Sequence, residues 1–163
     1  MNDLRPILIA EDSENDIELI LGALDRNNLA NRVVVVRNGA EALDYLYRRG
    51  SYASNGSPAP VVVLLDIKMP KVSGIETLRL MKADPVLSKI PVVMLTSSRE
   101  GPDMQECYRL GANAYVVKPL VFQDFFEAIR VLGQFWAIIN EAPETPESRA
   151  SLSTKKDHST AEP

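Results

Sequence analysis

Five short apolar runs, spaced along the chain from residue 7 to residue 117, constrain the fold more than any other feature of the sequence. Each run is continuous rather than alternating with polar residues, and β-branched residues dominate most of them. This pattern is typical of strands that are buried on both faces of a sheet. The runs are ILIA (7–10), VVVV (33–36), VVVLL (61–65), VVML (92–95) and AYVV (114–117).

Helical patterns separate these runs. Ser13 and Ser73 each precede an acidic residue by three positions, which predicts a capped helix start at both places. Pro102 suits the first turn of a fourth helix and Gly111 suits its end, and we expect a last helix over 121–141. After Ser13, apolar residues fall at the spacing of one helix face, namely Ile17, Ile20, Leu21 and Leu24.

The alternation of strand and helix, repeated five times, predicts an α/β fold of the (βα)5 type. Such a fold is a doubly wound, five-stranded parallel sheet with helices on both faces. We expect residues 1–142 to form this domain, with a polar surface loop over 50–60. From Pro143 onward Leu152 is the only large apolar residue. Residues 143–163 cannot bury enough surface to offset the entropy of ordering, and we expect a disordered tail.

Composition excludes several classes of protein. The net charge of −4 leaves no broad basic field for nucleic acid or for an anionic membrane, and no stretch approaches the length of a membrane span. The N-terminal apolar run is too short for a signal peptide. The single Cys107 excludes an internal disulfide and a cysteine-built metal site, and it suits packing better than redox sensing. We therefore expect a cytosolic protein.

Polar side chains follow the ends of four predicted strands, where ligands bind in folds of this class. Unpaired carboxylates at such an edge would repel each other, and a hard divalent cation with oxygen ligands, such as Mg²⁺, would relieve the repulsion. A cation with a lysine beside it could also receive a phosphoryl group, with Asp66 as the nucleophile. The residues are Glu11, Asp12, Asp66, Thr96, Ser97 and Lys118.

Four motifs in this order and spacing resemble the receiver domain of two-component response regulators, whose fold is flavodoxin-like. They are AED after the first strand, LLDIKMPKVSG, MLTSS and YVVKP, and the resemblance covers residues 5 to about 140. It implies that Asp66 is the phosphoacceptor and that Lys118 pairs with the phosphate. It also implies that Asp12 binds Mg²⁺ directly, that Glu11 acts mostly through water, and that the backbone carbonyl of Lys68 completes the metal shell.

The resemblance further implies a conformational switch. Thr96 is the hydroxyl that moves to the phosphate, and Tyr115 is the aromatic residue that swings inward with it. The coupling would run to the surface made by the fourth helix, the fifth strand and the last helix. The bond between Lys118 and Pro119 is expected to be cis, as in the family.

A narrower resemblance concerns the partner. The loop at 50–60 and the segment FFEAIRVLGQFWAIINEAP resemble the small regulators paired with bacterial phytochromes and related sensor histidine kinases. Such a kinase would donate the phosphoryl group. The only histidine, His158, lies in the expected tail, so the donor must be a partner or a small phosphodonor. Since 21 residues follow Ala142, we expect no DNA-binding output domain.

The last helix carries more apolar surface than one sheet face needs. One arc of the helical wheel holds Phe122, Phe125, Ile129, Leu132, Trp136 and Ile139. A second arc predicts a homodimer or partner surface, although a helix end tucked under the loops would also explain it. The second arc consists of Ala128, Val131, Phe135 and Ile138.

Two other classes of function fit part of the pattern. An Asp-nucleophile phosphohydrolase of the haloacid-dehalogenase type has a second Asp two residues after the nucleophile, and Lys68 stands there in this chain. A receiver-like module that binds partners without being phosphorylated is the other alternative. Taken singly, Asp66 could be a turn former and Thr96 a helix cap. The set of residues favours a phosphoacceptor signalling protein rather than an enzyme.

Overall fold

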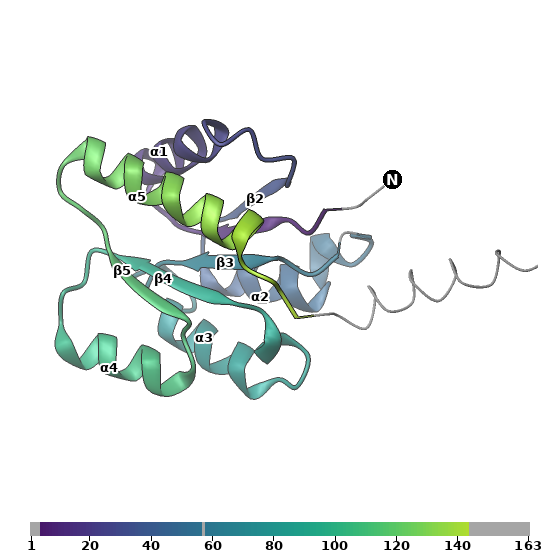
Figure 1. Ribbon diagram of the computed structural model, residues 1–163. Helices are drawn as coiled ribbons and strands as arrows, with labels where there is room; N and C mark the ends of the chain where they lie inside the picture. The colour runs from purple at the N-terminus through teal and green to yellow at the C-terminus, as the bar shows by residue number, and fades with distance from the viewer. Residues whose placement is uncertain (1–3, 57, 144–163) are drawn as a thin grey trace, which may run out of the picture.

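The computed structural model describes residues 4–56 and 58–143. Its centre is a parallel sheet with the strand order β2-β1-β3-β4-β5 (Figure 1). The predicted doubly wound α/β fold is therefore confirmed, and the ends of each strand agree with its apolar run to within one residue. The strands are β1 (Ile7–Ala10), β2 (Val33–Val36), β3 (Val62–Leu65), β4 (Val92–Thr96) and β5 (Ala114–Val117).

Helices cover both faces of the sheet (Figure 1). One face packs against α1 and α5, and the other packs against α2, α3 and α4. Short 3-10 turns lie at Gly50–Tyr52, inside the predicted polar loop, and at Leu87–Lys89. The α-helices are α1 (Glu14–Asp25), α2 (Gly39–Tyr47), α3 (Gly74–Ala83), α4 (Gly101–Leu110) and α5 (Phe122–Gln134).

The core has two halves because side chains alternate across the strands. Leu8 and Val63 point toward α2, α3 and α4, whereas Ile9 and Leu64 point toward α1 and α5. The central strands β1, β3 and β4 are buried along their whole length. The edge strands β2 and β5 are mostly half-buried. The prediction that all five strands are fully buried was wrong for these two, because an edge strand has a neighbour on one side only.

The predicted starts of α1 and α3 and both predicted ends of α4 are confirmed. The hydroxyl oxygen of Ser13 accepts from the backbone N–H of Asp16 at the start of α1, and that of Ser73 accepts from Glu76 at the start of α3. Pro102 lies in the first turn of α4, and Gly111 ends α4 in the left-handed conformation at φ 107°. These caps place the first turns of α1 and α3 directly beyond the ends of β1 and β3.

The last helix changes its winding near its end. After Gln134 the chain continues as a π-helical turn over Phe135–Ile139. Phe125, Ile129 and Trp136 are buried as the first arc predicts, but Phe122 and Ile139 are exposed. The wheel fails at Ile139 because a π turn holds more residues than an α turn. It fails at Phe122 because this first helical residue stacks on Phe126 at the surface.

No helix among residues 4–56 and 58–143 is long and apolar enough to cross a membrane.

Candidate functional site

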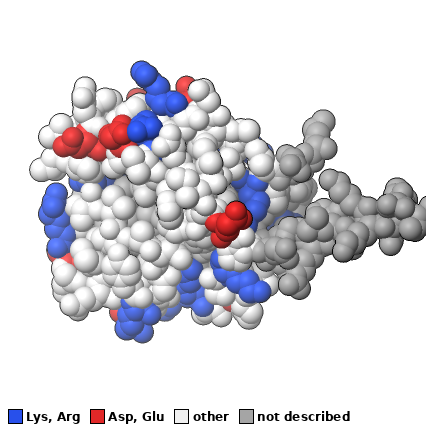
Figure 2. Space-filling view, in the orientation of Figure 1, with Lys and Arg blue, Asp and Glu red and all other residues white. Residues whose placement is uncertain are grey.

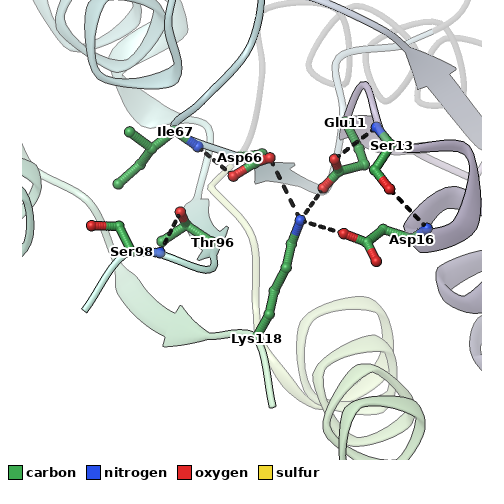
Figure 3. A network of polar contacts seen from close by, with 8 residues as sticks. All are labelled: Glu11, Ser13, Asp16, Asp66, Ile67, Thr96, Ser98 and Lys118. Carbon is green, nitrogen blue, oxygen red and sulfur yellow. Dashed lines mark hydrogen bonds and ion pairs between the residues drawn. The ribbon is translucent and has the colours of Figure 1, made fainter. Parts of the chain in front are cut away.

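The polar residues that follow the strand ends lie together at one edge of the sheet (Figure 3). Glu11 follows β1, Asp66 follows β3, Thr96 ends β4 and Lys118 follows β5. Their exposed fractions are 2%, 7%, 0% and 9%, so the site holds four polar residues that are almost completely buried. Asp12, beside Glu11, is exposed.

Three carboxylates form the acidic part of this site. Glu11, Asp12 and Asp66 each place one carboxylate oxygen so that the three oxygens lie within 4.8 Å of one another. Like charges at such distances are unfavourable unless a cation compensates them. Carboxylate oxygens are the ligands that hard divalent cations prefer, so this donor set fits such an ion. Lys68 lies in the loop after Asp66, and its side chain is exposed.

Lys118 supplies the positive charge of the site (Figure 3). Its Nζ donates to Glu11 Oε2 at 2.5 Å and to Asp16 Oδ2 at 2.8 Å, and it lies 3.5 Å from Asp66 Oδ2. The lysine comes from the end of β5, while its acidic partners come from the ends of β1 and β3 and from the first turn of α1. The parallel sheet, with the start of α1 beyond the end of β1, brings these distant segments together.

Burial and neighbouring charges have opposite effects on the pKa values of Glu11 and Lys118. Burial raises the pKa of Glu11 to about 7, although hydrogen bonds from Lys118 and from the Ser13 backbone N–H oppose the rise. Burial alone would lower the pKa of Lys118, but the hydrogen bonds to Asp16 and Glu11 and the charge of Asp66 outweigh it and raise that pKa. The ammonium therefore keeps its charge, and it holds the pKa of Glu11 below the value that burial alone would give.

Asp16 is a contact of the site that the sequence reasoning missed. The capping pattern explains its backbone N–H, which donates to the Ser13 hydroxyl, but that pattern says nothing of its carboxylate. A usable signal existed, because α1 begins directly after the acidic pair. The side chains of its first turn must then lie above the same edge of the sheet.

The backbone around Asp66 is fixed by the loop that follows it. Asp66 Oδ1 accepts from the N–H of Ile67 at 2.8 Å, and the N–H of Gly74 donates to the carbonyl of Ile67 at 2.8 Å. The start of α3 thus packs closely against the end of β3. A Cβ atom on Gly74 would lie 1.9 Å from the carbonyl oxygen of Asp66, so only glycine fits at this position.

A second network joins the end of β4 to α4. Thr96 Oγ1 accepts from the N–H of Ser98 at 3.2 Å, and the Tyr115 hydroxyl donates to the carbonyl of Ser98 at 3.0 Å. The Ser98 hydroxyl donates to Asp103 Oδ2 on α4 at 2.7 Å. The predicted pair Thr96 and Tyr115 is therefore joined through Ser98, a residue that the motifs did not single out.

One expectation taken from the resemblance was wrong. No peptide bond is cis among the residues that the structure describes, so the bond between Lys118 and Pro119 is trans. Trans is the commoner form before proline, and the contacts of Lys118 with its carboxylates hold the ammonium in place here.

Cys107 fits the predicted packing role. It is fully buried, and burial, with the charges of Asp103 and Glu106, raises the pKa of its thiol to about 11. A thiol of this kind carries little thiolate at neutral pH and reacts slowly.

The second apolar arc predicted for the last helix lies mostly at the surface. Val131, Phe135 and Ile138 are exposed by 51%, 43% and 64%, whereas Ala128 is half-buried. The face of the molecule that carries α5 and β5 shows few charged groups (Figure 2). Its apolar residues are separate from the polar site at the strand ends.

The sequence matches a family model and a known relative over most of its length. The model of the response regulator receiver domain matches residues 7–130. Response regulator Rcp1 of Synechocystis sp. is 34% identical over 135 residues, which are 83% of this chain and 90% of Rcp1.

Solved structures agree with this match. The phosphorylated cyanobacterial phytochrome response regulator RcpA is 36% identical and has a TM-score of 0.81, covering 86% of this chain and 99% of RcpA. The Mn²⁺-bound form of Rcp1 is 33% identical with a TM-score of 0.81, covering 86% of this chain and 99% of that chain. The bacteriophytochrome response regulator AtBRR is 56% identical with a TM-score of 0.68, covering 85% of this chain and 99% of AtBRR.

Proposed function

Because the chain belongs to the family of response regulator receiver domains, we propose that it accepts a phosphoryl group on Asp66 from a sensor histidine kinase. The observation that carries the proposal is the contact of Lys118 with the acids around Asp66. This contact puts a buried nucleophile, a cation site and a fixed positive charge in one place.

The transfer needs one bond to form and one to break. An oxygen of the Asp66 carboxylate attacks the phosphorus of a phosphohistidine on the kinase. The bond between phosphorus and the imidazole nitrogen breaks, its electron pair returns to the ring, and the ring takes up a proton. Lys118, already 3.5 Å from Asp66 Oδ2, pairs with the transferred group, and the Thr96 hydroxyl donates to it.

We propose Mg²⁺ as the cation of this site. The carboxylates of Glu11, Asp12 and Asp66 and the backbone carbonyl of Lys68 would hold it. When bound, the ion neutralises negative charge on the phosphoryl oxygens. The three clustered carboxylates support this assignment, and so does the similarity to a receiver solved in a Mn²⁺-bound form.

Mg²⁺ is expected to stabilise the protein against heat. An ion that binds only the folded state adds about 2.7 kcal/mol when its concentration is 100 times its Kd. Differential scanning fluorimetry with increasing Mg²⁺ should therefore show a rising unfolding midpoint. Asp12→Asn should lose most of the rise, because it removes an exposed ligand with little effect on the fold.

Asp25→Asn is the matched control for this titration. It removes the same charge from the far end of α1, where Asp25 is exposed, and should respond to Mg²⁺ as the wild type does. An equal response in Asp12→Asn and Asp25→Asn would exclude the proposed site.

The signal would leave the site through the network at the end of β4. A phosphoryl group on Asp66 draws the Thr96 hydroxyl toward itself, and Thr96 is joined through Ser98 to Tyr115 and to Asp103 on α4. A movement of Thr96 would therefore reach the surface formed by α4, β5 and α5. This chain of hydrogen bonds supports the proposed switch roles of Thr96 and Tyr115.

We propose a phytochrome-type histidine kinase in the cytoplasm as the phosphoryl donor. Among the similar solved structures, RcpA and AtBRR are named as response regulators of phytochromes. AtBRR shares more than half of its aligned residues with this chain, which supports a common kind of partner.

We also propose that the exposed arc of the last helix, consisting of Ala128, Val131, Phe135 and Ile138, forms a homodimer. Changing both Phe135 and Ile138 to serine should then shift the protein toward the monomer in sedimentation velocity, because their large apolar side chains would be buried between the copies. Val86→Ser is the control, since Val86 is also exposed, by 58%, but lies after α3. An unchanged balance of monomer and dimer in the double variant would rule out this surface.

A further inference from the structure

The ammonium of Lys118 has no spare donor in the structure. A lysine ammonium has three N–H groups, and Lys118 directs them at Glu11, Asp16 and Asp66 (Figure 3). The contact with Asp66 is the longest, at 3.5 Å, and the contact with Asp16 is 2.8 Å. The lysine is therefore held mainly on the side of β1 and α1, away from the nucleophile.

The two shorter contacts differ in how easily they can be released. Glu11 is 2% exposed, and its other carboxylate oxygen accepts from the N–H of Ser13, so it cannot move without leaving a buried charge unpaired. The Asp16 side chain is 30% exposed, so water can take the place of the ammonium at its carboxylate. Asp16 is the partner that Lys118 can leave at the lower free-energy cost.

We propose that Asp16 is a positioning residue that restrains Lys118 in the unphosphorylated protein and competes with the phosphoryl group for its ammonium. This inference rests on the proposed function of Asp66. Phosphorylation turns a weak contact at 3.5 Å into a pairing with a dianion, and the contact with Asp16 is given up in exchange. Asp16 thus favours the unphosphorylated state, and losing it favours the phosphorylated one.

The test compares Asp16→Asn with a variant of equal charge. Glu14→Gln removes one negative charge from the same first turn of α1, but Glu14 pairs with Arg37 rather than with Lys118. The replacement at Asp16 leaves the cap intact, because the cap uses the backbone N–H of that residue. Asp16→Ala serves as a second variant. The probe is beryllofluoride, a phosphoryl mimic, titrated at saturating Mg²⁺ and followed by NMR.

We expect Asp16→Asn and Asp16→Ala to bind beryllofluoride about threefold to tenfold more tightly than the wild type, the range of one partly exposed charge-assisted contact. The affinity of Glu14→Gln for beryllofluoride should stay within about twofold of the wild-type affinity, because this variant tests only the general effect of removing one negative charge. Acetyl phosphate should also label Asp16→Asn and Asp16→Ala faster than it labels Glu14→Gln and the wild type. A merely structural role of Asp16 would lower the unfolding midpoint without tightening binding.

The possible failures are distinguishable. If the wild type binds beryllofluoride and Asp16→Asn binds it no more tightly than Glu14→Gln does, this inference is overturned and the proposed function stands. If the wild type binds no beryllofluoride at saturating Mg²⁺, the proposed function is overturned and the inference falls with it.

Discussion

Replacing Lys118 by methionine is expected to lower the free energy of unfolding by about 3 kcal/mol at pH 8 without divalent cations. Methionine has a similar volume but no charge. Glu11 and Asp66 would stay buried with no ammonium to compensate them, and leaving a buried charge unpaired is strongly destabilising. Urea denaturation measures the loss. Lys89→Met is the control, because Lys89 is exposed and its replacement should change stability by less than about 0.5 kcal/mol.

The loss in the free energy of unfolding caused by Lys118→Met should become smaller as the pH falls. Burial raises the pKa of Glu11 from 4.5 to about 7, and Lys118 opposes that rise. A carboxyl group whose pKa is higher in the folded than in the unfolded state stabilises the fold at low pH and loses that contribution as the pH rises through the folded value. Without Lys118 the pKa of Glu11 lies above its value of about 7 in the wild type, so protonation relieves the buried charge as the pH falls through that higher value. Equal deficits at low and high pH would contradict this account.

Gly74→Ala is expected to destabilise the protein by about 3 kcal/mol and to displace Asp66. The added Cβ would lie 1.9 Å from the carbonyl oxygen of Asp66 and 2.8 Å from Cα of Ile67. Both atoms belong to the backbone, so the end of β3 and the start of α3 must move apart, at the cost typical of overpacking a rigid site. Urea denaturation gives the stability, and a titration with Mg²⁺ shows whether Asp66 has left its place.

Gly101→Ala is the matched control for this change. Gly101 also begins a helix, α4, yet nothing lies within 4 Å of the Cβ that it would gain. Alanine has the better helix propensity, so this variant should keep or slightly raise the stability and should bind Mg²⁺ normally. Equal losses in both glycine variants would mean that helix starts, rather than contact with Asp66, explain the effect.

The strands and the helix caps could be predicted because their signals are local. Continuous apolar runs mark β1, β3 and β4, and Ser13 and Ser73 mark two helix starts through contacts only three residues long. Once the sheet is parallel, its topology places the residues after the strand ends along one edge. The family resemblance, which the comparisons confirm, rests on those same residues.

The remaining features depend on contacts that no local pattern encodes. Asp16 and Lys118 are separated by 102 positions, and a capping pattern explains Asp16 without its carboxylate. Ser98 contacts Thr96 and Tyr115 through its backbone, which any residue type would offer, and only its contact with Asp103 uses its hydroxyl. The helical wheel misplaced Ile139 because it assumes one winding for the whole helix, and the π turn over 135–139 departs from it.

Intact-mass spectrometry tests the central claim most directly. The wild type and Asp66→Asn are incubated with acetyl phosphate, each with and without Mg²⁺. We expect the wild type alone, and only with Mg²⁺, to gain the mass of one phosphoryl group that hydroxylamine removes, as an acyl phosphate on Asp66 requires. RcpA, which has been solved in a phosphorylated form, is the positive control. An unlabelled wild type under conditions that label RcpA, or a label that persists in Asp66→Asn, would contradict the assignment of Asp66 as the phosphoacceptor.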